Sequence, residues 1–395
     1  MAKLLEITGK AISGEWGQDD DTGTGIPVLR TTNFTNEGFV NYKNVVTRSI
    51  SKKNIAEKYL RHGDVIIEKS GGSDKQPVGR VIFFEGEENK YLFNNFTGLL
   101  RVQNPEEWLP KYVFYALYAY YRNGGTRAFE NRTTGLHNLQ VDNYVKSVDI
   151  PKLSYRKQQH ICETLDHVRD AVAYRERQLT KPDELIKARF VEMFGDCRLN
   201  PKGWVTKNLD QVADVGSSKR VFVEELQSEG IPFYRGTEVG ALAEGKSIRP
   251  ELFITEGHYK QLCEATGKPQ KGDLLMPSIC PDGRIWVVDT DAPFYFKDGR
   301  VLWVHLTSQN YNPVFLLYTL KDRIMTDYES IASGTTFAEL KIFALKKCRI
   351  FDVPLSLQNQ FADFVAEVDK SKVEVQKALD QTQLLFDSLM QQYFG

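Results

Sequence analysis

Two copies of one series of short motifs occupy this chain, and this duplication constrains the fold more than any other feature. Gly25–Arg30 (GIPVLR) recurs as Gly230–Arg235 (GIPFYR), and His62–Ile67 (HGDVII) recurs as Lys271–Met276 (KGDLLM). Weaker pairs keep the same order: Val78–Phe83 with Asp282–Val287, Leu100–Val102 with Leu302–Val304, Tyr112–Phe114 with Pro313–Phe315, Gly135 and Leu139 with Gly334 and Leu340, Asp149–Pro151 with Asp352–Pro354, and Phe194–Gly195 with Phe394–Gly395. The period of about 200 residues is too long for a solenoid, whose repeats run about 20 to 50 residues. The 395 residues are therefore predicted to form two homologous halves.

Each half begins with short strand-like runs and continues as one long helical pattern. Val65–Ile67 and Val301–Leu306 are rich in β-branched and aromatic residues between Gly, Pro and Asp, which is typical of strands. A helix is predicted near Leu109–Arg122, and its tyrosines recur at helical spacing, which favours packing on a sheet over a platform for stacking bases. We predict an α+β fold, with mixed α/β domains at residues 1–153 and 197–355 and long helices at residues 154–196 and 356–395.

The two long segments carry a narrow apolar stripe. Apolar residues recur at alternating steps of four and three, which predicts a coiled-coil seam over about five heptads. A helix lying on a globular domain would need a wider stripe. We therefore expect the helices to pair with each other, antiparallel, and to relate the halves by a pseudo-twofold axis. The predicted seam contains Ile161, Leu165, Val168, Val172, Leu179, Ile186, Phe361, Val365, Val368, Val375, Leu379, Phe386 and Leu389.

One residue conflicts with a straight first helix. Pro182 lies on the predicted seam, where it removes a backbone hydrogen bond and clashes with the preceding turn. The following acidic residues also suit a new helix start. We expect a kink or break near Pro182, with no counterpart in the second helix.

The sequence carries few signs of catalytic chemistry. It lacks a P-loop, a G-x-G-x-x-G after a strand, and the Asn-Pro-Pro-aromatic tetrapeptide of amino-methyltransferases. His160 and His167 lie two helical turns apart without a third ligand nearby, so solvated histidines are favoured over a metal site. We expect no catalytic residue, no metal site and no cofactor bound by this chain.

Charge and cysteine content bear on partners and compartment. The 51 Lys and Arg residues against 52 Asp and Glu residues give a net charge of −1, so the chain has no overall positive field to attract nucleic acid. Five widely spaced cysteines favour reduced thiols in the cytoplasm. The N-terminus turns polar and acidic too early for a signal peptide, and no apolar stretch is long enough to span a bilayer. A cytoplasmic protein without a membrane segment is predicted.

An antiparallel helix pair carrying two similar domains suits a ligand with its own approximate twofold, such as duplex DNA. At this point the chain resembles the specificity subunit of type I restriction–modification systems. The duplicated GIPxxR and Gly-Asp segments carry the resemblance, together with the helix entries Ile150–Gln159 and Val353–Gln360 and the Phe-Gly helix ends.

The resemblance implies a role in defence against phage. Two target recognition domains would each read one half of a bipartite, asymmetric sequence in double-stranded DNA, and the helices would set the spacer between the halves. The helices would also dock two adenine-N6 methyltransferase subunits, which a restriction and translocase subunit would join. S-adenosylmethionine, ATP and Mg would act on those partners, and this chain would not be an enzyme by itself. Since no segment is strongly basic, we expect the partners to supply much of the DNA affinity.

Candidate DNA contacts are polar residues on the shared motifs and their loops. Arginine can bind guanine, asparagine adenine, and glutamate cytosine N4, while a glycine-rich loop at residues 69–75 could approach phosphates. A surface or turn role is the alternative for each, above all for Arg80 and Arg284, which occupy one repeated position. The candidates are Arg30, Thr31, Asn33, Lys69, Ser70, Ser73, Lys75, Arg80, Arg132, Thr133, Thr134, His137, Lys219, Arg220, Arg235, Thr237, Glu238, Arg284, Lys297, Arg300, Thr335 and Thr336.

Two other functions fit the same architecture. The chain could be a DNA-independent adaptor whose coiled coil presents two heads to proteins, or the relic of a fused methyltransferase–specificity enzyme. A neighbouring reading frame with the Asn-Pro-Pro-aromatic and donor-binding motifs would favour the DNA-specificity function.

Overall fold

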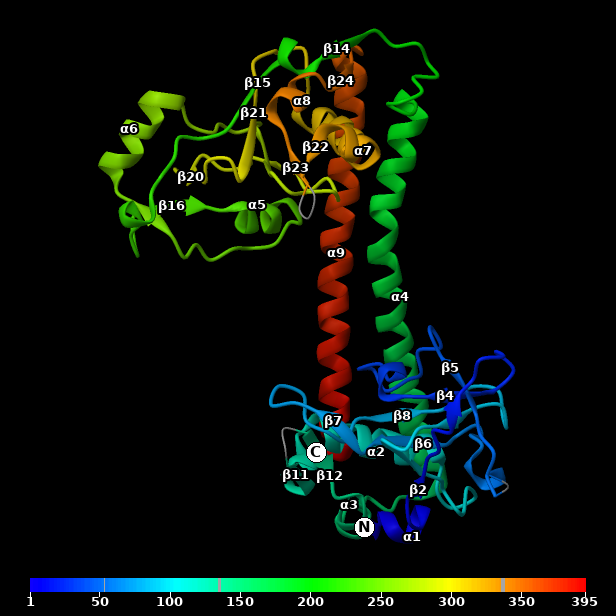
Figure 1. Ribbon diagram of the computed structural model, residues 1–395. Helices are drawn as coiled ribbons and strands as arrows, with labels where there is room; N and C mark the ends of the chain where they lie inside the picture. The colour runs from blue at the N-terminus through cyan, green and yellow to red at the C-terminus, as the bar shows by residue number, and fades with distance from the viewer. Residues whose placement is uncertain (53, 134–135, 335–337) are drawn as a thin grey trace. The chain divides into compact units, whose positions relative to one another are not determined.

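The protein divides into two compact units, and one of them is assembled from both ends of the chain. The structure is a computed structural model that describes residues 1–52, 54–133, 136–334 and 338–395. Unit 1 comprises Met1–Arg177 with Gln376–Gly395, and unit 2 comprises Gln178–Val375. Two 40-residue helices, α4 (Tyr155–Phe194) and α9 (Leu355–Phe394), each contribute one part to unit 1 and one part to unit 2 (Figure 1).

Unit 1 is built from short strands and three further α-helices besides its parts of α4 and α9. Its helices are α1 (Leu4–Thr8), α2 (Pro110–Arg122) and α3 (Val141–Ser147). Its strands are β1 (Ala2–Lys3), β2 (Ile12–Ser13), β3 (Gln18–Asp19), β4 (Ile26–Leu29), β5 (Val46–Ser49), β6 (Val65–Glu68), β7 (Ser70–Gly72), β8 (Val81–Phe83), β9 (Leu92–Phe93), β10 (Thr97–Leu100), β11 (Glu130–Thr133), β12 (Leu136–Leu139) and β13 (Asp149–Ile150).

Unit 2 repeats this plan with two additional helices, α5 and α6. Its helices are α5 (Gly236–Ala243), α6 (Glu256–Thr266), α7 (Pro313–Ile331) and α8 (Ile342–Lys346). Its strands are β14 (Thr206–Asn208), β15 (Ala213–Gly216), β16 (Ile231–Tyr234), β17 (Phe253–Ile254), β18 (Leu274–Pro277), β19 (Trp286–Val287), β20 (Tyr295–Phe296), β21 (Val301–Leu306), β22 (Ala332–Ser333), β23 (Glu339–Leu340) and β24 (Arg349–Phe351).

The two units share one sheet topology. Unit 1 contains a sheet with the order β2-β10-β6-β8, and unit 2 contains one with the order β15-β21-β18-β19. A parallel pair stands beside each sheet, β4 with β9 in unit 1 and β16 with β20 in unit 2. The registers agree as well, because Leu100 faces Val65 and Val304 faces Leu274. The duplication seen in the sequence is therefore a duplication of the fold, and positions on the matching strands can be equated.

The repeated Gly-Asp pair is a turn that brings the sheet to a helix start. Gly63 and Gly272 have φ of 91° and 94°, a left-handed conformation that L side chains rarely adopt. A Cβ on Gly63 would lie 3.2 Å from the Cβ of Pro110, the first residue of α2, and Gly272 has the same relation to Pro313 of α7. The next residue closes the turn, since a carboxylate oxygen of Asp64 accepts a 2.7 Å hydrogen bond from the amide of Arg61. The motif recurs because both the turn and the close approach demand these residue types.

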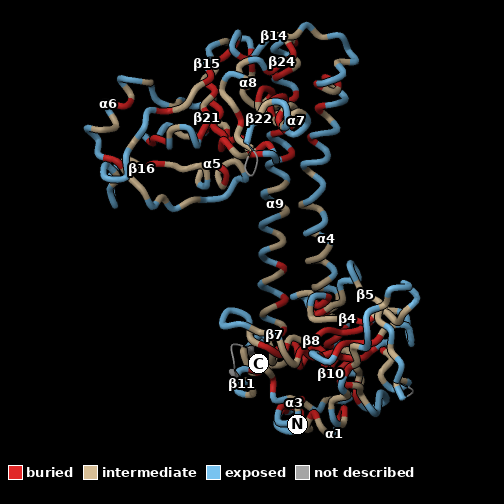
Figure 2. Tube along the Cα trace, viewed as in Figure 1, coloured by how far each residue is buried: buried red, intermediate tan, exposed pale blue. Residues whose placement is uncertain are grey.

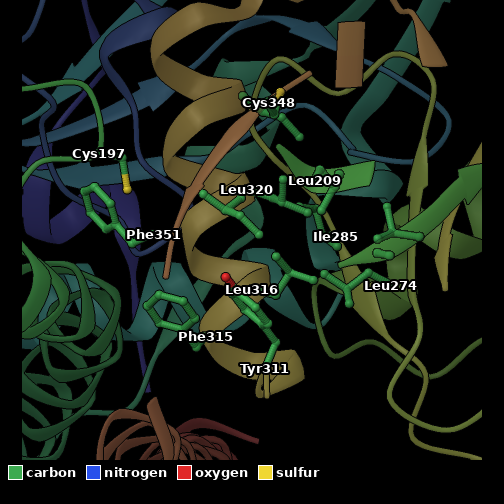
Figure 3. Packing of buried hydrophobic residues seen from close by; sticks show 14 of the residues in the cluster. Cys197, Leu209, Leu274, Ile285, Tyr311, Phe315, Leu316, Leu320, Cys348 and Phe351 are labelled. Carbon is green, nitrogen blue, oxygen red and sulfur yellow. The ribbon is translucent and has the colours of Figure 1, made fainter. Parts of the chain in front are cut away.

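Each unit has its own apolar core between its sheet and its helices (Figure 2). In unit 2, Phe315, Leu316 and Leu320 of α7 are fully buried and belong to one cluster with Leu274 of the sheet and Phe351 of β24 (Figure 3). In unit 1, the residues from Tyr112 to Ala119 of α2 are all buried. The tyrosine-rich segment is thus a packed helix, as its spacing predicts.

A pair of buried glutamines joins the long helices to these cores. The Gln158 side chain accepts a 2.8 Å hydrogen bond from the amide of Leu109 and donates to the carbonyls of Glu107 and Leu153. Gln358 makes the same set of bonds in unit 2, with the amide of Asn312 and two carbonyls. The sequence pattern points to the neighbouring Gln159 and Gln360 instead, and both of those are exposed. The buried position was missed because glutamines one or two residues apart are indistinguishable by pattern.

The long helices run antiparallel. In unit 2, Phe190 and Phe194 near the end of α4 contact Phe361 near the start of α9, with ring centroids 5.4 and 5.6 Å apart. In unit 1, Arg175 of α4 donates a hydrogen bond to Thr382 of α9. All predicted seam residues are buried or half-buried, and those towards the middle of the helices are half-buried. Phe190, Phe194 and Met390 also belong to the cores, although the narrow seam pattern leaves them out.

Of the kink or break expected near Pro182, the break does not occur. Helix α4 continues without interruption from Tyr155 to Phe194, with Pro182 inside it (Figure 1). The proline frees one backbone carbonyl, but the flanking residues 181 and 183–185 are exposed, so water can reach this turn. Ending the helix there would also sacrifice the burial of Ile186 and Phe190. Packing of the following turns therefore outweighs the local signal.

The observed architecture confirms the α+β fold and the strand runs predicted at residues 65–67 and 301–306. All five cysteines lie in the described part of the chain and are free. Among the described residues, no helix combines the length and apolar character needed to cross a bilayer.

Candidate nucleic-acid interface

The basic candidates of unit 2 come together where three distant segments meet. After β15, the hydroxyls of Ser217 and Ser218 donate hydrogen bonds of 2.7 and 2.6 Å to the carbonyls of Val301 and Phe296. The amide of Lys297 donates to the carbonyl of Tyr234, the last residue of β16. Since backbone bonds tie the segments together, residues 217–220, 234–238 and 296–301 form one surface, which we call the unit 2 loop face.

Three cations on the unit 2 loop face point to solvent. Lys219, Arg220 and Lys297 are exposed. The Arg220 guanidinium lies over the ring of the exposed Phe222, 5.2 Å from its centroid. Neither Lys219 nor Lys297 has an ion-pair partner among the residues that the structure describes. These side chains are free to meet an anionic backbone.

Arginines beside these cations are partly committed to carboxylates. Arg300 forms an ion pair with Glu339 yet keeps 56% of its side chain exposed. Arg235 donates to Glu238 and Glu251. Both can turn towards a ligand only by exchanging one hydrogen-bond partner for another. They remain candidates of lower standing than the free lysines.

Unit 1 brings two predicted groups together through a three-stranded sheet. Strand β12 pairs with β7 on one side and β11 on the other, so the glycine-rich loop lies beside the strands that hold Arg132, Thr133 and His137. The amide of Leu139 bonds to the carbonyl of Lys69, just as Leu340 bonds to Ser278 in unit 2. The structure thus places the backbone of both groups side by side, and we call this region the unit 1 loop face.

Residues of the glycine-rich loop differ in their accessibility. Ser73 and Lys75 are exposed, whereas Lys69 and Ser70 are half-buried. Burial lowers the pKa of the Lys69 ammonium, whose Nζ lies 3.4 Å from the hydroxyl of Ser13. The Ser73 hydroxyl accepts a hydrogen bond from the amide of Gln76 and so closes the loop. Lys75 is therefore the most available cation of this loop.

Several sequence candidates have structural partners, which favours the structural alternative for them. Asn33 is buried, and its amide bonds to the backbone of Arg30 and Asn41. Arg80 forms an ion pair with the buried Glu68, 3.0 Å away, and donates to the carbonyl of Thr31. Side chains engaged in this way are not available to read a base.

A structural role is also favoured for Glu238. Although burial opposes its charged form, hydrogen bonds from Arg235 hold the pKa of Glu238 down at about 2. It caps α5 by accepting from the backbone amide of Arg235, and it accepts a further bond from Thr237. A carboxylate held by these donors stabilises the turn after β16, and its oxygens already accept hydrogen bonds within the protein.

The remaining candidates fall into three groups. Arg284 pairs with Asp282 and Glu244, and His137 pairs with Glu130. Arg30 and Thr31 are half-buried at the end of β4, where Arg30 donates to the carbonyl of Asn44. Thr134, Thr335 and Thr336 lie outside the described residues, and so do the side chains of Arg132 and Thr133.

Sequence reasoning missed two exposed aromatic rings near these faces. Phe96 in unit 1 is 53% exposed, and its carbonyl accepts the amide of Lys69. Phe222 in unit 2 is 53% exposed beside Arg220. Exposed rings can stack on unpaired bases or wedge between base steps. Phenylalanine within a β-rich pattern reads as core, so only their exposure distinguishes them.

Comparisons with known proteins agree on one family. Residues 201–382 match the family model of the type I restriction modification DNA specificity domain. A protein of Haemophilus influenzae that is named as a type I restriction enzyme specificity subunit is 27% identical over 158 residues, which are 40% of this chain and 38% of that protein. The match therefore spans about two fifths of that relative's length.

Two solved structures resemble the whole chain. The S subunit of a type I restriction–modification system from M. genitalium has a TM-score of 0.53 and 16% identity, with 100% of this chain and 95% of that chain covered. A chain from a structure of type I restriction–modification complex assembly and conformational transition has a TM-score of 0.62 and 17% identity, with 100% and 96% covered. At these identities the likeness concerns the fold.

Proposed function

Since this chain resembles the specificity subunits of type I restriction–modification systems in part of its sequence and in its fold, we propose that it belongs to that family and directs such a complex to its DNA sequence. One observation carries this proposal: two units of one topology present equivalent loop faces with different side chains. Two units with the same sheet topology but different side chains on their loop faces suit a target whose two halves differ in sequence. Each unit would read one half of a bipartite, asymmetric site in double-stranded DNA.

The two long helices would set the gap between the half-sites. Antiparallel contacts join them within each unit, and the same two helices pass through both units. A helix is a stiff connector with a fixed rise of 1.5 Å per residue. Helix length would thus be converted into a fixed number of unread base pairs.

The outer faces of the same helices would dock two adenine-N6 methyltransferase subunits. Apolar side chains outside the seam are exposed on both helices, among them Leu185, Val191, Leu384 and Leu385. In unit 2, a hollow of about 420 Å³ between α4 and α7 is lined by Phe190, Val191, Tyr318 and Met325, with charged residues around it. Apolar surface with a polar surround is typical of a protein-binding site.

Catalysis would belong to the partners. The methyltransferase subunits would bind S-adenosylmethionine, and a restriction and translocase subunit that joins them would use ATP and Mg. This chain would contribute the choice of sequence and no chemical step of its own.

The proposal is tested by mapping methylation. The chain is co-expressed with the methyltransferase of its own locus in a host free of adenine methylation, and N6-methyladenine is mapped genome-wide by long-read sequencing. We expect a two-part motif with a fixed unread gap, methylated on both strands and absent when this chain is omitted. Absence of methylation from a soluble, associated pair would overturn the proposal.

A further inference from the structure

The two units differ in charge at structurally equivalent positions. Strand β2 places Ile12 opposite Leu99, and strand β15 places Gly216 opposite Trp303. Leu99 and Trp303 occupy the same place in the shared sheet, because they pair with the residues two beyond the repeated Asp. Ile12 is therefore equivalent to Gly216. Three residues further along, Glu15 is equivalent to Lys219.

A second pair follows from the parallel strands. The amide of Asn94 donates to the carbonyl of Leu29, and the amide of Lys297 donates to the carbonyl of Tyr234, which is the matching residue of β16. Asn94 is therefore equivalent to Lys297. A third pair is Phe96 with Arg300, whose carbonyls accept the amides of Lys69 and Ser278.

In unit 1 these positions offer no free cation. Glu15 is a carboxylate, and hydrogen bonds from Lys52 and Lys58 lower its pKa. The two lysines are thereby tied to a negative charge. Asn94 is buried and bonds to Thr97.

In unit 2 the same positions hold two exposed lysines without an ion-pair partner among the described residues. Hydrogen bonds of the adjoining backbone fix where these lysines emerge, because Ser218 holds the segment before Lys219 and Tyr234 holds the amide of Lys297. Two solvated ammonium groups that emerge from a held backbone are suited to the phosphates of a DNA backbone, which carry no sequence information themselves.

We propose that the two heads bind DNA unequally, with unit 2 supplying a phosphate anchor through Lys219 and Lys297 that unit 1 lacks. This inference rests on the proposed function. Unit 1 reads its half-site with less electrostatic support and depends more on hydrogen bonds, base contacts and its exposed Phe96. Phosphate contacts release counterions, so an anchor of two lysines has a defined signature in the salt dependence of binding.

The test compares two double variants that remove the same charge from different units. Lys219→Gln/Lys297→Gln removes the anchor of unit 2, and Lys69→Gln/Lys75→Gln removes two loop cations of unit 1. Lys346→Gln/Lys347→Gln is the control, because it removes two lysines of unit 2 from another place. Helix α8 contacts β15 and the preceding element η4 (Leu209–Gln211), whereas Lys219 follows β15. Each chain is purified in complex with its methyltransferase, and its affinity for a duplex carrying the mapped motif is measured from about 50 to 300 mM salt.

We expect the unit 2 variant to reduce the slope of log affinity against log salt by about 2, and to weaken motif and scrambled duplexes by the same factor. The unit 1 variant should change the slope by less than about 1, and the control should match the wild type. The methylated motif should stay the same in all of them.

A wild-type slope for Lys219→Gln/Lys297→Gln, or an equal change in the unit 1 variant, would overturn the inference while the two-part motif still upheld the proposed function. A changed motif in the unit 2 variant would also overturn it, since the lysines would then read bases. Absence of any motif from the wild-type complex would refute the proposed function and the inference together.

Discussion

Gln158 and Gln358 show how one side chain can fix a junction between elements. Each is buried and bonds to one amide and two carbonyls that would otherwise lack partners. A buried backbone group without a partner costs about 1–3 kcal/mol. The same glutamine occurs twice, two hundred residues apart, because both units contain this junction between a long helix and the core.

We therefore predict that Gln358→Leu destabilises unit 2. The change leaves the amide of Asn312 and the carbonyl of Val353 unpaired, and we expect a loss of about 1–3 kcal/mol, or about 2 to 10 °C in the midpoint of its thermal transition. Calorimetry of the full chain measures this shift. Gln360→Leu, at an exposed position on the same helix, is the control, and an equal effect of both changes would contradict the role of the buried amide.

Charged residues show what the sequence could not give at this scale. Arg80 and Arg220 look alike in a list of candidates, but one pairs with the buried Glu68 and the other is exposed. The difference depends on which residue from another strand stands opposite, and no local pattern records it. Duplication supplies a partial remedy, because a residue present in both halves, such as Arg80 with Arg284, is more often structural.

At the scale of elements, Pro182 shows that core packing can outweigh the helix-breaking preference of a single residue. A proline inside a helix costs about 3 kcal/mol through its lost hydrogen bond and steric clash. Helix α4 nevertheless continues, because Ile186, Phe190 and Phe194 are buried beyond it. Periodicity therefore predicted this element better than the individual breaker did.

We expect Pro182→Ala to stabilise unit 2. It restores the bond to the carbonyl of residue 178, and part of that gain is offset because alanine leaves the unfolded chain more flexible than proline does. A net gain of about 2 kcal/mol is expected, measured as a rise in the thermal midpoint. Lys181→Ala, one residue earlier at an exposed position, controls for helix propensity. A fall in the midpoint would show that the proline ring itself contributes packing.

Other elements illustrate where pattern reasoning stops. The strand over Val301–Leu306 and the helix starting at Pro110 have the predicted bounds, since strong apolar runs and a proline mark them. Helices α5 and α6 were not predicted. Their sequences contain several glycines and polar residues and little periodicity, and α6 is held by a Thr255 cap and by its contacts in unit 2.

At the scale of the whole molecule, the proposed spacing role makes a direct prediction. Seven residues inserted into both α4 and α9 preserve the four-and-three phase of the seam and lengthen each helix by about 10 Å, or about three base pairs. We expect the mapped motif to keep both half-sites and to gain a gap longer by about three base pairs. Insertion into α4 alone shifts one helix against the other and should abolish methylation. A motif with the original gap would show that the helices do not set the spacing.

The duplicated plan was the part of this molecule most accessible from sequence, because the Gly-Asp segments serve a turn that tolerates few alternatives and the GIPxxR segments form the equivalent strands β4 and β16. The division of the chain was less accessible. Units meet within the helices, at residues 177 and 375, and not at the ends of the strand-rich regions. Periodicity reveals a helix, but it does not reveal which core each of its turns packs against.

This discontinuity of unit 1 has a consequence during synthesis on the ribosome. Ile161 and Leu165 belong to one buried cluster with Phe386 and Met390, which are translated more than two hundred residues later. At about 5–20 residues per second, the nascent chain waits on the order of 10 to 40 seconds for those partners. Unit 2 is contiguous from residue 178 to 375 and can close first. Unit 1 therefore emerges first from the ribosome but is the last to be completed, and until then its exposed apolar residues are suited to chaperone binding.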